Sequence, residues 1–198
     1  MSLELCDEFE GGFGWTEPGI LERTSHALEA GGAVLVFDPV DMPGIDERIR
    51  ALGEPEAVVQ LLDRHERNSA AVAARLGVPH LRMEFGAHGE GGQLVRIVWN
   101  RFWKEVAFWE PDRRVLVVAD ALGTVGYFTA PGEAIGVHPV LRLRPPRELG
   151  ELQPEHILCG HGAGVHGPAA AAALREALAT SRRRLPRALA STLRRRRS

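Results

Sequence analysis

Six consecutive polar residues, 63–68, carry the side chains most suited to chemistry in this chain. The segment reads Asp63-Arg64-His65-Glu66-Arg67-Asn68, between an apolar run and a helix-like run. A strand that ends in a polar cluster and then opens a helix is a common place for a site. Carboxylates and neutral imidazoles are ligands of divalent metals, whereas a guanidinium is not. The segment therefore indicates a metal-binding motif in which several ligand positions hold other residues.

Apolar patterning predicts the elements that must position this segment. Strands are expected at residues 24–29, 33–38, 57–62, 78–83, 93–99, 105–109, 115–119 and 157–159. Helices are expected at residues 44–52, 69–76 and 168–183. Strand pairs, a βαβ passage, further strand pairs and a final strand and helix predict an α/β sandwich with helices on its outer faces.

Length and composition bound the class of protein. With 198 residues, 44% hydrophobic and 25% charged, the chain is expected to form one sizeable soluble domain, or one domain and a tail. No run of 18 apolar residues predicts a transmembrane helix, and the acidic N-terminus does not resemble a secretory signal. Two cysteines are too few for a disulfide framework, so a cytoplasmic location is expected.

An ordered set of motifs resembles the metallo-β-lactamase superfamily over roughly residues 20 to 180. That family carries His-x-His-x-Asp-His after a strand, then a lone His, an Asp at a strand end and a His in Gly-His-Gly. Here residues 63–68 stand at the first motif, and Arg101, Asp120 and His161 match the three later positions in order. Asp38 in Val36-Phe37-Asp38-Pro39 is similar to a structural segment of the family. The resemblance implies an αββα sandwich (α/β, or α+β) with a two-metal site at strand ends.

The replacements in the motif decide which metals could bind. By residue type Asp63 and His65 could still serve the first metal, but Arg101 could not. At the second metal, Arg67 and Asn68 replace two ligands. The positions that keep a ligand type are Asp63, His65, Asp120 and His161.

Loss of two metals would leave buried acids in need of positive charge. Carboxylates held together without ions repel one another and are costly to desolvate. We therefore expect Arg67 or Arg101 to form a bidentate ion pair with Asp120 or Asp63.

Three functions follow from these residues. The first is a non-catalytic protein with an eroded dimetal site and no cofactor, which binds a small anionic ligand or has a structural role. Its pocket would comprise Asp63, His65, Arg67, Asn68, Arg101, Asp120 and His161. The second is a hydrolase with one zinc or similar ion at Asp63, His65, Asp120 and His161, acting on an ester, thioester, lactone or amide. The third is an interaction protein that uses its C-terminal tail.

The tail, residues 181–198, differs in charge from the domain expected at residues 1–180. It holds eight arginines and no acid, while the rest of the chain has 16 basic and 26 acidic residues, a net charge of −10. Leu185, Leu189 and Leu193 recur every four residues, which is typical of an amphipathic helix. Such a helix suits an anionic membrane surface, nucleic acid or an acidic protein, or the acidic body of another copy in a homo-oligomer.

Overall fold

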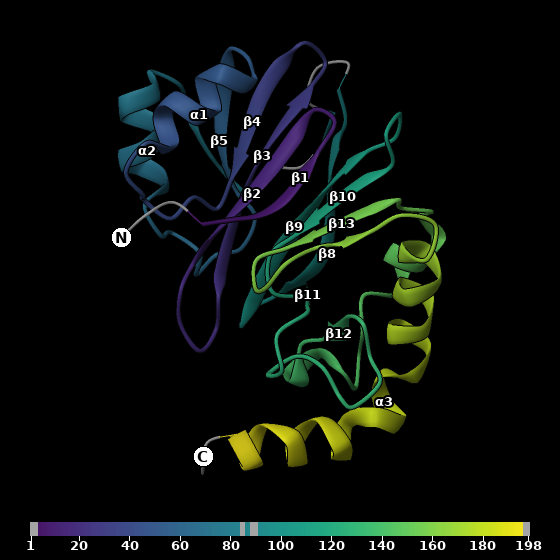
Figure 1. Ribbon diagram of the computed structural model, residues 1–198. Coiled ribbons are helices and arrows are strands. Elements are labelled where there is room, and N and C mark those ends of the chain that lie inside the picture. The colour runs from purple at the N-terminus through teal and green to yellow at the C-terminus, as the bar shows by residue number, and fades with distance from the viewer. Residues whose placement is uncertain (1–3, 84–85, 88–90, 196–198) are drawn as a thin grey trace.

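Two six-stranded sheets packed face to face form the centre of the molecule (Figure 1). The computed structural model describes residues 4–83, 86–87 and 91–195. The first sheet, in spatial order, contains β1 (Leu5–Phe9), β2 (Gly12–Glu17), β3 (Arg23–Ala30), β4 (Ala33–Phe37), β5 (Pro55–Gln60) and β6 (His80–Arg82). The second contains β14 (Val165–His166), β13 (His156–Cys159), β10 (Val115–Val118), β9 (Trp103–Glu110), β8 (Gln93–Asn100) and β7 (Gly86–Ala87).

Alternation along the strands builds two cores. In β4, Leu35 and Phe37 face the second sheet, where the Phe37 ring lies 5.0 Å from the ring of Phe108. Val34 and Val36 of the same strand face outward into a second core. Helices α1 (Ile45–Leu52) and α2 (Ser69–Leu76) cover that outer face, as Figure 1 shows.

The N-terminal part of helix α3 (Ala170–Arg195) packs beside the second sheet and completes the αββα order, while its C-terminal part extends away from the sheet (Figure 1). The segment between the adjacent strands β10 and β13 carries a small sheet of β11 (Leu122–Gly123) and β12 (Gly136–Val137) and the 3-10 helices η1 (Pro139–Leu141) and η2 (Arg147–Glu151). The fully buried Arg142 pairs with Glu133 at 2.6 Å and donates to the Ser181 carbonyl of α3. This contact ties the segment to the helix.

Two parallel strand pairs bring four loops to one edge. Val118 of β10 is opposite Cys159 of β13, so Asp120 and His161 each follow two residues beyond this pair. In the first sheet, β4 runs parallel to β5, and their ends lead into Asp38 and the segment 63–68. Because carboxyl ends of parallel strands meet at one edge, these loops lie together.

The predicted fold class is confirmed, with local differences. Helix α2 has the predicted bounds, and the predicted strands at residues 24–29, 33–38 and 115–119 correspond to β3, β4 and β10. The hairpin of β1 and β2 was not predicted, because β2 contains Gly12 and Gly14, and glycine is depleted in strands. Helix α3 continues across the predicted boundary at residue 180 as far as Arg195; residues 196–198 lie outside the described part. Among described residues, no helix is long and apolar enough to span a membrane.

Candidate metal centre

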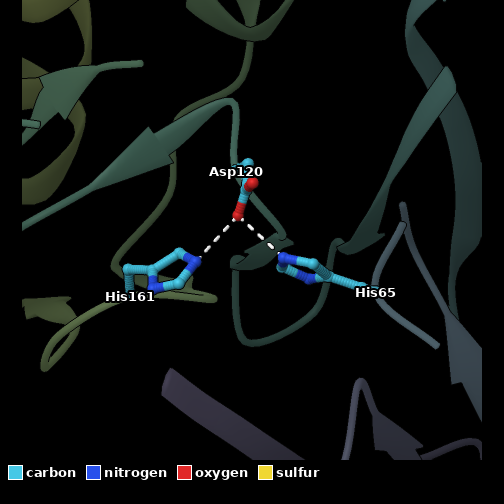
Figure 2. Close-up of side chains that lie close together, drawn as sticks. All are labelled: His65, Asp120 and His161. Atoms are coloured by element: carbon cyan, nitrogen blue, oxygen red, sulfur yellow. Dashed lines mark ion pairs between the residues drawn. The ribbon is translucent and has the colours of Figure 1, made fainter. Parts of the chain in front are cut away.

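Three side chains from three loops converge at the shared edge (Figure 2). Nε2 of His65 lies 2.9 Å from Oδ1 of Asp120, and Nε2 of His161 lies 3.0 Å from the same oxygen. One donor atom of each residue lies within 4.8 Å of the other two. Two imidazoles and a carboxylate are a known ligand set for zinc and other divalent transition metals.

The second ring nitrogen of each imidazole has a partner that determines its orientation. Nδ1 of His65 donates to Oδ2 of Asp38 at 3.0 Å, and Nδ1 of His161 donates to the Leu21 carbonyl at 2.7 Å. Asp38 is buried and also accepts from the Leu61 backbone N–H. With Nδ1 committed as the donor, Nε2 of each ring is the atom free to bind a metal, as in carboxylate–histidine–metal arrangements.

The contacts of Asp120 are close but are not regular hydrogen bonds. Oδ1 is buried and has no hydrogen bond of acceptable angle among the described residues, although two imidazole nitrogens lie within 3.0 Å of it. Burial raises the pKa of Asp120, but the two imidazoles at Oδ1 outweigh this and hold it far below its usual range. Asp120 is therefore a carboxylate, as a metal ligand must be.

His65 lies between two carboxylates. Burial lowers its pKa, but the charge of Asp38, the close contact with Asp120 and the hydrogen bond to Asp38 prevail and raise it to about 9. Without metal, His65 is thus an imidazolium at neutral pH, and a metal would take the place of its Nε2 proton.

Glu105, a residue that sequence reasoning passed over, holds the loop of Asp120. It is fully buried, and its Oε1 accepts the backbone N–H groups of Ala119 at 3.1 Å and Ala121 at 2.9 Å. Oε2 accepts from the indole of Trp103 at 2.7 Å. Burial and the charge of Asp120 raise the pKa of Glu105 to about 8, against the opposing effect of these donors and His65. Both neighbours of Asp120 are therefore fixed by one side chain.

Replacing Glu105 should loosen this loop. Glu105→Ala leaves two backbone N–H groups and an indole N–H without their acceptor, and unsatisfied buried donors cost about 1–3 kcal/mol each before water or relaxation compensates. We expect the free energy of unfolding to fall by about 2–4 kcal/mol in urea denaturation. Glu105→Gln keeps an acceptor oxygen for Ala119 and Ala121 and should lose less. Equal stability of Glu105→Ala and wild type would contradict this role.

Comparison with known proteins identifies the architecture. No family model and no curated protein sequence matches the chain. The metallo-β-lactamase from Pontibacter korlensis matches with a TM-score of 0.63 at 8% identity, over 90% of this chain and 99% of that chain. The one from Hirschia baltica matches with a TM-score of 0.62 at 11% identity, over 92% and 97%. TTHA1623 in a di-iron-bound form matches with a TM-score of 0.57 at 20% identity, over 81% and 94%.

The chain has the metallo-β-lactamase fold. Its site lies where the motif resemblance placed it, at strand ends along one edge of the sandwich. Many chemistries share one fold, so the activity must be argued from the residues of the site. Of the four residues at motif positions that keep a ligand type, the structure brings together His65, Asp120 and His161 but not Asp63.

Asp63 and Arg101 do not join this group. The carboxylate of Asp63 pairs with Arg64 at 3.3 Å, on the exposed side of the loop. Arg101 is exposed in the turn between β8 and β9, with its guanidinium 4.2 Å from the centre of the Phe102 ring. The match of Arg101 to a ligand position therefore brings no side chain into the cluster.

Arg67 enters the site region but not as an ion-pair partner. Its Nη1 donates to the carbonyls of Thr24 at 2.6 Å and Asp38 at 2.9 Å, and its Nη2 donates to the Gly160 carbonyl at 2.9 Å. Among the described residues no ion pair joins Arg67 or Arg101 to Asp120 or Asp63, so the predicted bidentate pair is wrong. Backbone carbonyls converge on the guanidinium, while the groups that face Asp120 Oδ1 are the two imidazoles.

The side chain of Asn68 also has a hydrogen-bond partner outside the cluster. Its Oδ1 accepts the backbone N–H of Asp41 at 2.9 Å, just before helix α2 begins. The amide therefore holds the loop after β4 and does not face the metal cluster as an unpaired ligand.

His138 packs near this group and should make stability depend on pH. Burial, with the charges of Arg64 and His161, lowers its pKa to about 4 against the charge of Asp120, and its Nδ1 accepts the Val140 N–H. Between pH 6.5 and about 4 the unfolded chain binds a proton that the folded chain does not, so stability falls as pH falls. The loss is at most about 3 kcal/mol.

His138→Asn keeps an acceptor and cannot titrate. Its free energy of unfolding, measured in urea, should therefore decline less than that of the wild type from pH 7 to pH 4.5. Equal declines in the two proteins would contradict this.

Proposed function

We propose that this protein binds one divalent metal ion through His65, Asp120 and His161 and hydrolyses an acyl compound there. The substrate class is an ester, thioester, lactone or amide. The observation that carries the proposal is the pair of Nε2 atoms, each set by a hydrogen bond at Nδ1, that face one carboxylate oxygen at 2.9 and 3.0 Å.

The residues fit such an ion. Ligand atoms of a tetrahedral zinc lie about 3.3 Å apart, so Oδ1 of Asp120 and each Nε2 need to separate by only a few tenths of an ångström. Asp120 Oδ1, buried without a regular hydrogen bond, is the atom that an ion would satisfy. When bound, the ion would polarise a substrate carbonyl and lower the pKa of a water molecule. Three protein ligands leave a coordination position for substrate or water.

The chain's own residues orient this centre. Asp38 and the Leu21 carbonyl hold the two imidazoles with Nε2 inward, and Glu105 fixes the loop of Asp120 from both sides. Arg67 joins the loops that carry Asp38 and His161 through its carbonyl contacts. These contacts position ligands before a substrate arrives, which is the main contribution of a protein to metal catalysis.

One ion is better supported than two. At the second-metal positions Arg67 carries a permanent positive charge and Asn68 has another partner. The same geometry gives less support to an anion-binding pocket, because Arg67 is committed to carbonyls and Arg101 lies in an exposed turn. That the basic tail, residues 181–198, binds an anionic partner is a separate proposal, which does not depend on the metal centre.

Metal titration tests the proposal directly. Protein stripped with a chelator should take up one equivalent of Zn²⁺ or Mn²⁺, measured by calorimetry and by elemental analysis after gel filtration. Hydrolysis of chromogenic esters, thioesters, lactones and amides should then require the metal and stop on addition of chelator. Absence of tight metal binding would contradict the metal centre, and metal binding without hydrolysis of any of these classes would contradict the activity.

A further inference from the structure

A second group of histidines lies where the outer edges of the two sheets meet. His156 of β13 and His166 of β14 are directly opposite each other in an antiparallel pair. Their Nδ1 atoms lie 2.8 Å apart. Strand β1, at the edge of the other sheet, supplies Asp7 and Phe9 to the same place. None of these residues belongs to the first metal centre.

Asp7 determines which nitrogen of His166 faces His156. Nε2 of His166 donates to Oδ1 of Asp7 at 2.8 Å, and this carboxylate is buried, with 1% of its side chain exposed. The Gly164 N–H also donates to Oδ1 at 2.8 Å, and the Cys6 thiol donates to Oδ2. Since Nε2 carries the proton, Nδ1 of neutral His166 presents a lone pair toward its neighbour.

His156 is held on its other side. Its ring stacks on Phe9 with the centroids 4.5 Å apart and the planes 17° apart. Without a metal, His156 donates its Nδ1 proton to His166; a metal would take that place, and the proton would move to Nε2 of His156 or to solvent. The contact between the two Nδ1 atoms is exposed, so an ion can reach both nitrogens from solvent.

The separation of the two nitrogens, 2.8 Å, matches neighbouring positions around a square-planar or octahedral ion. Donors about 2.0 Å from an ion are about 2.8 Å apart at neighbouring square-planar or octahedral positions and about 3.3 Å apart at tetrahedral ones. We propose that His156 and His166 form a second metal site that binds Ni²⁺ or Cu²⁺ through both Nδ1 atoms, oriented by Asp7. Water completes the coordination.

Titration with Ni²⁺ tests this site, because Ni²⁺ does not oxidise nearby thiols. Wild-type protein should bind one more equivalent than His156→Gln or His166→Gln, and paramagnetic broadening should reach the imidazole signals of both residues. His80→Gln, which removes a half-buried histidine elsewhere, is the matched control and should bind as wild type. Unchanged stoichiometry and affinity in both the His156 and His166 variants would overturn the proposal.

Two further variants test the role of Asp7 and the independence of this site from the first metal centre. Asp7→Asn should weaken Ni²⁺ binding about 10- to 100-fold at this site, as loss of an orienting carboxylate does; wild-type affinity in a folded Asp7→Asn protein would remove Asp7 from the site. Asp120→Asn should leave the extra equivalent in place. Loss of that equivalent in Asp120→Asn would mean that the extra Ni²⁺ binds at the first centre and would overturn the proposal. The tests of the two sites are therefore independent of each other.

Discussion

Asp120→Asn should reduce the affinity for Zn²⁺ by more than about 100-fold. Replacement of an orienting outer residue already costs 10- to 100-fold, and this change removes the only anionic ligand of the cluster. The neutral amide keeps the size of the side chain but lacks the charge that faces both imidazoles. Calorimetric titration of chelator-treated protein at one pH measures the loss.

Asp112→Asn is the matched control. Asp112 lies exposed in the turn between β9 and β10, so the same chemical change there should leave zinc affinity at the wild-type value. Circular dichroism verifies that both variants are folded. If Asp120→Asn and Asp112→Asn bound zinc equally, the proposed metal centre would be wrong.

Arg67→Met should lower the free energy of unfolding by about 3–5 kcal/mol. The guanidinium makes three hydrogen bonds to backbone carbonyls, and bonds that involve a charged group contribute about 1.5–3 kcal/mol each. Some of that loss is offset, because the Gly160 and Asp38 carbonyls also accept from the Thr24 N–H and the Ser25 hydroxyl. Urea denaturation monitored by tryptophan fluorescence measures the change.

Arg64→Met, three residues earlier, provides the comparison. Arg64 is exposed; it pairs with Asp63, donates a solvent-exposed hydrogen bond to the Phe102 carbonyl and lies over the ring of Trp103. Exposed pairs of this kind contribute at most about 1 kcal/mol, so this variant should remain close to wild type. Similar losses in Arg64→Met and Arg67→Met would show that the three carbonyl contacts do not stabilise the fold.

The order of most strands and helices could be predicted from the sequence, because each is indicated by a pattern of neighbouring residues. Short continuous apolar runs in residues 33–37 and 115–118, and helical spacing with a terminal glycine in residues 69–77, act within a few residues. The ordered polar positions at strand ends also identified His65, Asp120 and His161. The β1–β2 hairpin could not be predicted in this way, because β2 contains two glycines, which are depleted in strands, and owes its conformation to the strands beside it.

The sequence by itself determined which side chains could bind a metal, since residue type sets ligand chemistry. Only the tertiary structure decided which of them meet. Asp38 and Arg67 adopt positive φ angles of 43° and 41°, a strained backbone that contacts with distant segments must stabilise. Arg67 reaches a carbonyl 93 residues away in sequence. Such contacts turn Asp63 outward and Arg67 toward backbone oxygens, leaving two imidazoles and one carboxylate at the site.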